Sequence, residues 1–229
     1  MKTGLTLEQL AAEITRQQSA KEDYVVNTGN LRLESYGPDL TLRVLDSDGA
    51  DRIEPLEIGD IAHRQIGTHL SIPAKYYERM RSEDPGLLAH NVNTWLERTP
   101  AQRMIRVLDG KARAYLSNRY LRMDNYSIAS AVLPILAEIP DVRIESCQIT
   151  DSRMYIKAVN PRLQEDVTPG DTVQAGVVIS NSEVGLGSVN IQPLIYRLVC
   201  SNGMVVNDAA TKRNHIGRAT DAEENFQLY

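Results

Sequence analysis

Residues 102–117 read QRMIRVLDGKARAYLS, a run that predicts a β-hairpin and, with it, a mainly antiparallel sheet. Asp109-Gly110 stands between two stretches of alternating side chains, and Asp-Gly favours the two-residue turn that joins antiparallel strands. Such a turn fixes the register, so Arg106 is expected opposite Arg113. One face of the hairpin is then mostly apolar. The other face would carry Arg106, Lys111, Arg113 and Tyr115.

Residues 142–159 repeat this arrangement around Asp151-Ser152. Pairing across that turn places Gln148 opposite Tyr155 and Ser146 opposite Lys157. The basic and aromatic residues of this second polar face are Arg153, Tyr155 and Lys157. A solvated outer face of an antiparallel sheet produces the same pattern, because Arg, Lys and Tyr are common on protein surfaces. Two hairpins with one arrangement favour instead a surface that binds an anionic polymer with flat rings.

The charge of the chain is uneven. The 229 residues carry a net charge of −5, which excludes a protein that coats nucleic acid through bulk charge. Residues 1–60 contain twelve acidic and six basic side chains, whereas residues 101–162 contain ten basic and six acidic ones. A local basic surface is therefore expected on an acidic protein. The chain has ten Tyr but only one Trp and one Phe, so tyrosines are the main candidates for stacking on bases.

Several classes of protein are disfavoured. Cys147 and Cys200 form neither a disulfide framework nor a metal-ligand spacing, and the four histidines are scattered. No signal peptide is expected, because Met1-Lys2-Thr3-Gly4 leads into an amphipathic helix. No apolar run approaches the roughly 18 residues of a membrane helix. We therefore expect a cytoplasmic protein without a metal, a cofactor or a membrane partner.

The periodicity of apolar residues predicts the remaining elements. Helices are expected over 6–20, 59–70, 73–83, 87–98 and 124–139, and strands over 23–35, 40–46, 172–180 and 188–200, with a loop over 160–171. The predicted fold class is α+β, a mainly antiparallel sheet built from β-hairpins with helices packed on one face. The predicted organisation is an N-terminal helix over 1–22, a core domain over 23–206 and a polar tail over 207–229.

Four stretches together resemble a known family. They are AYLSNRY at 114–120, ISNSEVGLGS at 179–188, RLVCSNGM at 197–204 and HIG at 215–217. This ordered set is similar to the phage- and plasmid-related family of unknown function, whose members are encoded by phages, prophages and conjugative plasmids. The resemblance implies a mobile-element protein that handles DNA, and it implies no catalytic residues.

A second likeness is one of architecture. Strand hairpins, a helix laid across them and a basic face are similar to the single-strand annealing proteins of phages, which form rings or filaments around single-stranded DNA. Because no motif is shared, this likeness is an association between folds and implies function only by analogy.

The function predicted from these observations is binding of single-stranded DNA in recombination, annealing or replication, by a chain that forms a homo-oligomer. The residues expected to contact nucleic acid are Arg106, Lys111, Arg113, Tyr115, Arg119, Arg153, Tyr155 and Lys157. The arginines and lysines would contact phosphates, and the two tyrosines would stack on bases.

Two alternatives remain open. The first is a protein-interaction module in which the arginines pair with an acidic phage or host factor. The second is an enzyme, either a metal-dependent nuclease or a hydrolase that uses Cys200 with His215. The nuclease would need its carboxylates among Asp208, Asp221, Glu223 and Glu224. The chain shows no catalytic signature, so no catalytic residue is predicted.

Overall fold

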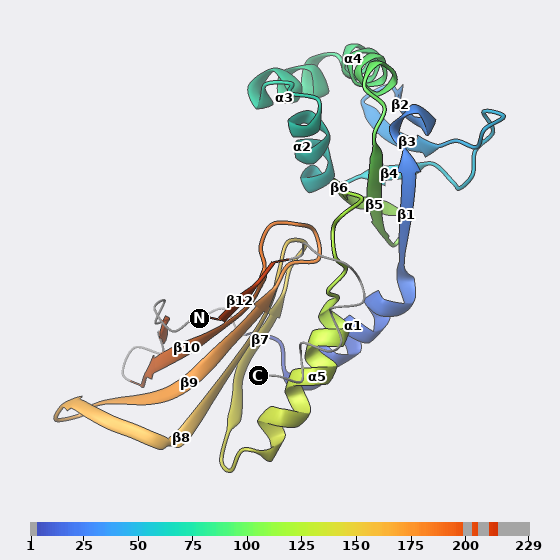
Figure 1. Ribbon diagram of the computed structural model, residues 1–229. Coiled ribbons are helices and arrows are strands. Elements are labelled where there is room, and N and C mark those ends of the chain that lie inside the picture. Colours follow the sequence, from blue (N-terminus) through green and yellow to red (C-terminus); the bar gives the residue numbers. More distant parts are fainter. Residues whose placement is uncertain (1–3, 199–202, 206–210, 215–229) are drawn as a thin grey trace. The chain divides into compact units, whose positions relative to one another are not determined.

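The computed structural model describes residues 4–198, 203–205 and 211–214. The chain divides into two compact units: unit 1 comprises Met1–Ser19 and Leu121–Tyr229, and unit 2 comprises Ala20–Tyr120. This division differs from the single core domain expected over 23–206, because the boundaries fall near residues 20 and 120. The helices and mainly antiparallel sheets confirm the predicted α+β class (Figure 1).

Unit 2 is a six-stranded sheet with three helices. Its elements are β1 (Lys21–Asn27), the short 3-10 helix η1 (Thr28–Asn30), β2 (Leu31–Tyr36), β3 (Asp39–Val44), β4 (Leu56–Ile58), α2 (Asp60–His69), α3 (Ala74–Glu83), α4 (Pro85–Arg98), β5 (Gln102–Leu108) and β6 (Lys111–Ser117). The strand order is β1-β5-β6-β4-β3-β2, and β4 runs parallel to β6. The strand predicted over 23–35 is wrong as one element, because η1 divides it into β1 and β2.

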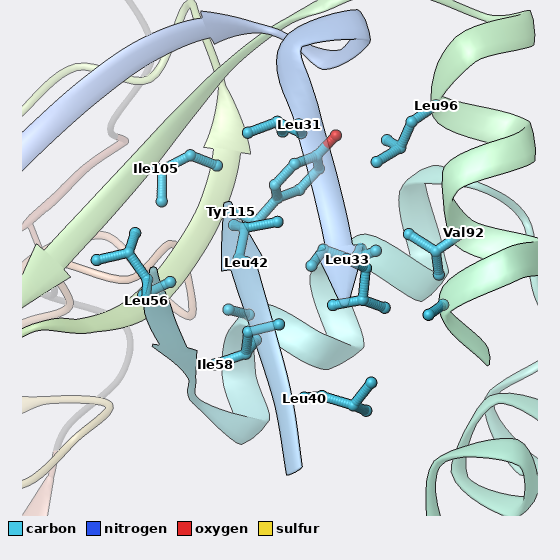
Figure 2. Packing of buried hydrophobic residues seen from close by; sticks show 14 of the residues in the cluster. Leu31, Leu33, Leu40, Leu42, Leu56, Ile58, Val92, Leu96, Ile105 and Tyr115 are labelled. Carbon is cyan, nitrogen blue, oxygen red and sulfur yellow. The ribbon is translucent and has the colours of Figure 1, made fainter. Parts of the chain in front are cut away.

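One face of this sheet packs on the helices. Leu33, Ile105 and other buried apolar side chains of the strands lie in the same cluster as Val92 and Leu96 of α4 (Figure 2). Burial of each such side chain contributes about 1.5–3 kcal/mol. The amphipathic helices over 60–98 are therefore held by the sheet.

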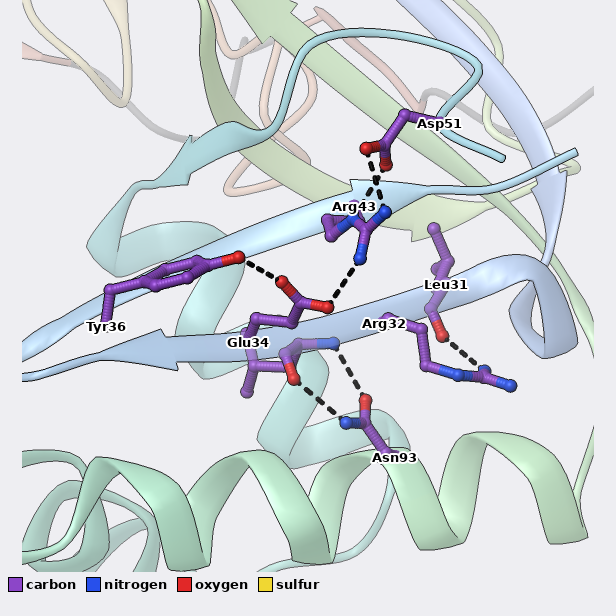
Figure 3. Close-up of polar contacts among 8 residues, drawn as sticks. Leu31, Arg32, Glu34, Tyr36, Arg43, Asp51 and Asn93 are labelled. Atoms are coloured by element: carbon purple, nitrogen blue, oxygen red, sulfur yellow. Dashed lines mark hydrogen bonds and ion pairs between the residues drawn. The ribbon is translucent and has the colours of Figure 1, made fainter. Parts of the chain in front are cut away.

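A side-chain clamp joins α4 to the edge strand β2 (Figure 3). Asn93 accepts from the Leu33 N–H at 2.8 Å and donates to the Leu33 carbonyl at 2.9 Å. The amide thus satisfies backbone groups that an edge strand leaves unpaired. On the same strands, Arg43 pairs with both Glu34 (2.6 Å) and Asp51 (2.7 Å). The two Asn93 contacts hold α4 against β2, and α4 lines the pocket described below.

The first hairpin forms at the predicted turn, with a different register beyond it. Asp109 and Gly110 both have positive φ (52° and 73°), as a type I′ turn requires. The pairs next to the turn are those predicted. The register then shifts between Arg106 and Val107, so Arg106 lies opposite Ala114. The predicted Arg106–Arg113 pair is therefore wrong, because a β-bulge adds one residue to β6.

Unit 1 is a second sheet with two helices. Its elements are α1 (Leu7–Ala20), α5 (Asn125–Glu138), β7 (Arg143–Ile149), β8 (Met154–Thr168), β9 (Asp171–Asn181), β10 (Val189–Arg197), β11 (Gly203–Val205) and β12 (Thr211–Arg213). The strand order is β11-β10-β9-β8-β7, and β12 also pairs with β10. The loop predicted over 160–171 is wrong, because β8 and β9 continue as a long hairpin that turns at Pro169-Gly170.

Helices α1 and α5 cover one face of the unit 1 sheet (Figure 1). Leu10 of α1 and Ile128 of α5 share a buried cluster with Met154, Ile156 and Ile179 of the strands. The second hairpin keeps the predicted register over residues 146–149 and 154–157. The side chains of β8 that alternate with Met154 and Ile156 therefore lie on the sheet face away from these helices.

A buried histidine makes the stability of unit 2 depend on pH. His63 is 2% exposed, and its Nδ1 lies 2.9 Å from the Tyr77 hydroxyl. Burial, assisted by the positive charge of Arg81, lowers the pKa of His63 from 6.5 to about 4. The unfolded chain takes up this proton near pH 6.5 and the folded unit only near pH 4. Stability is therefore full above pH 6.5 and falls as the pH drops towards 4.

We expect unit 2 to lose about 2 kcal/mol of unfolding free energy between pH 7.5 and pH 5. Urea denaturation followed by fluorescence of Trp95, the single tryptophan of the chain, measures this loss. Glutamine at this position retains a group able to bond Tyr77 but does not titrate. His63→Gln should therefore lose distinctly less stability over the same interval, and an equal loss in both proteins would refute the assignment to His63.

Candidate nucleic-acid interface

Arg106 is a structural residue, contrary to the prediction. Its side chain is 0% exposed, and its Nε donates to the Asp23 carboxylate at 2.9 Å. Asp23 lies on β1, directly opposite Arg106 in the register of β1 and β5. A guanidinium without exposed surface does not reach a phosphate. The pairing of β1 with β5 therefore removes Arg106 from the candidate interface.

Tyr115 is likewise unable to stack on a base. It is 3% exposed, and its hydroxyl lies 2.8 Å from His69 Nδ1. The Arg103 guanidinium lies 5.6 Å from the centre of its ring. Burial raises the pKa of the Tyr115 hydroxyl, which stays protonated. The shifted register turns this ring towards the helices of unit 2, so the predicted stacking role is wrong.

The other predicted residues of the first hairpin are not organised as one face. Lys111 forms an ion pair with Glu57 at 2.5 Å. Arg113 is half-buried at the bulge, and Arg119 is exposed in the turn after β6. With Arg106 and Tyr115 buried, these three side chains lack the aromatic platform that the prediction required.

Arg153 holds a loop of its own unit. Its Nη2 donates to the Leu186 carbonyl at 2.5 Å, and its guanidinium lies against Gly187, where a Cβ atom would collide with it. A side chain at 187, between β9 and β10, would displace this guanidinium. This contact uses Arg153 for positioning the loop.

The same loop carries a buried polar network that the sequence analysis missed. Asn181, Ser182 and Glu183 are between 0% and 5% exposed. Asn181 Nδ2 donates to the Met123 carbonyl (2.9 Å) and to Asn125 Oδ1 (2.8 Å), and the Asn125 N–H donates to Glu183 (2.6 Å). A carboxylate at the start of α5 also stabilises the helix, because it lies at the positive end of the helix dipole. The stretch ISNSE thus fastens α5 to the sheet, and its run of polar residues at a strand end was the available signal.

Tyr155 and Lys157 do lie together, on the sheet face away from α1 and α5. Hydrogen-bonded register places Gln148, Tyr155, Ser180, Asn190 and Lys212 in one row across five strands, and Ser146, Lys157, Val178 and Gln192 in the next row. We call these nine residues the polar sheet face. The first row spans roughly 19 Å at about 4.8 Å per strand.

The polar sheet face is positively charged. It contains Lys157, which is half-buried, and Lys212, which is exposed, and neither row contains a carboxylate. The nearest acidic neighbour in the chain, Glu145, accepts from the Tyr196 hydroxyl at 2.8 Å and pairs with Arg143 at 3.3 Å. Within the described part of the chain, the acid next to these rows is therefore already paired.

Two further features suit a ligand with flat, polar rings. Tyr155 is half-buried and packs against a small apolar cluster of Val159, Val178, Leu194 and Tyr196, which supports its ring. Asn190 Oδ1 is buried and has no hydrogen-bond partner among the residues that the structure describes. A buried acceptor of this kind needs a donor, which an ordered water or a bound molecule can supply.

The residues that the structure describes give little support to the alternative that the chain is an enzyme. Cys147 is buried, and burial raises the pKa of its thiol, which disfavours the nucleophilic thiolate. Cys200, His215 and the four C-terminal carboxylates lie outside the described residues. Within the described ranges, no group of three or more His, Cys, Asp or Glu residues could hold a metal ion. In the same part of the chain, no helix has the length and apolar composition needed to cross a bilayer.

Comparison with known proteins shows that the residues of the polar sheet face lie within a segment that matches a protein family. Residues 114–228 match the model of DUF932, a domain of unknown function. The matched segment runs from within β6 through the sheet of unit 1, and it includes every residue of the polar sheet face and of the loop network. Searches of curated proteins and of solved structures found no match.

Proposed function

The chain belongs to the DUF932 family, whose domain has no known function. For this domain we propose that the polar sheet face binds single-stranded nucleic acid. One observation carries the proposal. Tyr155 and Lys157 stand side by side in two rows that are rich in hydrogen-bonding side chains and free of carboxylates. Single-strand binding without sequence preference uses this combination of cations and aromatic rings.

The polar sheet face suits single strands better than duplexes. A base stacks on Tyr155 only when it is unpaired, because in a duplex its faces are covered by neighbouring bases. The amides of Gln148, Asn190 and Gln192 can donate to or accept from any base edge. A duplex would offer the same sheet only phosphates. We therefore propose single-stranded DNA as the ligand.

The biological setting is part of the proposal. The motifs at 114–120 and 179–188 resemble those of phage- and plasmid-encoded proteins, so we propose a role in mobile-element recombination, annealing or replication. A homo-oligomer would join several such faces into a longer binding path. Joined faces would raise the affinity for a long strand without any new contact in each copy.

Fluorescence anisotropy with labelled single-stranded and double-stranded oligonucleotides, across a salt series, tests the proposed binding. The expected result is tighter binding of single strands and a log–log salt slope of about −0.7 per phosphate contacted. Light scattering at the same protein concentrations records the oligomeric state. Absence of binding at low salt would overturn the proposal and favour the protein-interaction alternative.

A further inference from the structure

Unit 2 contains a pocket that the proposed DNA interface does not use. The pocket has a volume of about 470 Å³ and lies between the end of α2, the following loop, α3 and α4. It is lined by His69, Leu70, Ser71, Ile72, Pro73, Tyr76, Met80, Asn91, Trp95 and Thr99. This volume is in the range of pockets that bind small organic molecules.

Two large aromatic side chains line the pocket while remaining exposed. Tyr76 of α3 is 48% exposed, and Trp95 of α4 is 42% exposed. Their neighbours one residue further along the two helices, Tyr77 and Leu96, are 2% and 1% exposed and belong to the core. Tyr76 and Trp95 therefore do not belong to the buried core. Their exposed rings can stack on a flat ligand that lies against the apolar side chains of the pocket.

Two arginines lie beside residues that line the pocket. The Arg98 guanidinium lies 5.4 Å from the centre of the Trp95 ring, so a positive charge accompanies the stacking surface. The Arg103 charge is close enough to His69 to help burial lower the pKa of that histidine. None of the ten lining residues is acidic. A ligand that combines a flat ring with a negative group is complementary to this arrangement.

Polar side chains that line the pocket can form hydrogen bonds with the edge of such a ring. Asn91 Nδ2 donates to the Leu87 carbonyl (3.0 Å) and contacts Met80 Sδ (3.3 Å). Both contacts use Nδ2, so Asn91 Oδ1 can accept from a ligand. His69 uses Nδ1 towards Tyr115, which leaves Nε2 for a second partner. An amide oxygen and an imidazole nitrogen recognise the amino, imino and carbonyl groups of a nucleobase.

We infer that this pocket binds a nucleoside monophosphate, with the base in contact with both Trp95 and Tyr76 and the phosphate near Arg98. The ring and the polar edge match features of the lining, and the anion matches Arg98, which lies beside Trp95. The inference goes beyond the proposed function, because the pocket lies in unit 2 and none of its residues belongs to the polar sheet face. An experiment can therefore refute the assignment of one site without refuting the other.

The single tryptophan makes the test direct. Titration of the full chain with AMP, GMP, CMP and UMP, with excitation at the red edge of tryptophan absorption, should give saturable quenching of Trp95 fluorescence by at least one of them. Inorganic phosphate and ribose 5-phosphate should bind at least about tenfold more weakly, because they lack the stacking ring. Benzoate, a flat anion without a base edge, should also be weaker.

Matched variants separate this pocket from other surfaces. Tyr76→Leu should raise the Kd of the best nucleotide by roughly 5- to 100-fold. Tyr126→Leu removes a similarly exposed tyrosine from α5 of unit 1 and should leave the Kd unchanged. Circular dichroism of both variants confirms that they fold. Absence of saturable quenching at millimolar nucleotide, equal affinity for benzoate, or an unchanged Kd in Tyr76→Leu would overturn the inference.

Discussion

Replacing both Lys157 and Lys212 by glutamate is expected to weaken single-stranded DNA binding by roughly 10- to 100-fold at low salt. Both lysines lie on the polar sheet face, in adjacent rows. The substitution removes two phosphate contacts and places two negative charges beside the strand. The log–log salt slope should also become shallower by about 1.4, since each contact with a single strand contributes about 0.7. Fluorescence anisotropy across a salt series measures both quantities.

A matched double variant controls for net charge. Lys75→Glu/Lys111→Glu changes the charge of the chain by the same amount, at exposed or partly exposed positions of unit 2. It also tests Lys111, which the sequence analysis assigned to the interface. Affinity close to that of the unaltered protein is the expected result. Equal losses in the two double variants would mean that bulk charge, rather than the polar sheet face, determines binding.

Arg106→Met is expected to destabilise unit 2 by roughly 3–5 kcal/mol, because it leaves the Asp23 carboxylate buried without its guanidinium. The Asp23 side chain is 9% exposed and that of Arg106 is 0% exposed, so water does not replace the lost partner. Asp23→Leu should cost a similar amount for the same reason. Urea denaturation followed by Trp95 fluorescence reports the loss, because Trp95 lies in the same unit.

The double variant Arg106→Met/Asp23→Leu distinguishes this explanation from a loss of packing. Replacing both members of a buried ion pair by apolar residues of similar volume is often close to neutral, so most of the stability should return. The exposed pair of Lys111 and Glu57 is the comparison, and Lys111→Met should cost less than about 1 kcal/mol. Additive losses in the double variant would contradict the proposed role of the buried pair.

The helices and the hairpin turns could be predicted from sequence because their signals are local. Apolar spacing predicted the helix that the structure shows over 60–69, and Asp109-Gly110 predicted the turn of the first hairpin. The bulge at Arg113 could not be predicted in this way. The bulge lets Ala112 and Tyr115, which regular alternation would place on opposite faces, share one buried cluster with the helices.

Long-range pairing decided which predicted residues remain at the surface. Arg106 became a core residue because β1, 83 positions earlier, supplies Asp23 opposite to it. In the second hairpin the expected register holds around Tyr155 and Lys157, so these two side chains keep the common face that their alternation predicted. The polar sheet face then gains Ser180, Asn190 and Lys212 from strands whose neighbours the alternation does not specify.

The loop network shows a different limit of sequence reasoning. Asn181 and Glu183 are hydrophilic residues in a glycine-containing connection, a pattern typical of exposed loops. They are buried because the segment that leads into α5 presents polar groups at Met123 and Asn125 that need partners. A motif that resembled a family signature is therefore explained here by its contacts within unit 1.

Photo-crosslinking of a 5-iodouracil-substituted single-stranded oligonucleotide, with the adduct located by mass spectrometry, tests the central claim most directly. The proposal predicts an adduct at Tyr155, the ring that stands between Gln148 and Ser180 on the polar sheet face. Tyr155→Leu should remove that adduct, whereas Tyr126→Leu should retain it. Adducts confined to unit 2, with none on strands β7 to β10, would contradict binding of single-stranded DNA at this face.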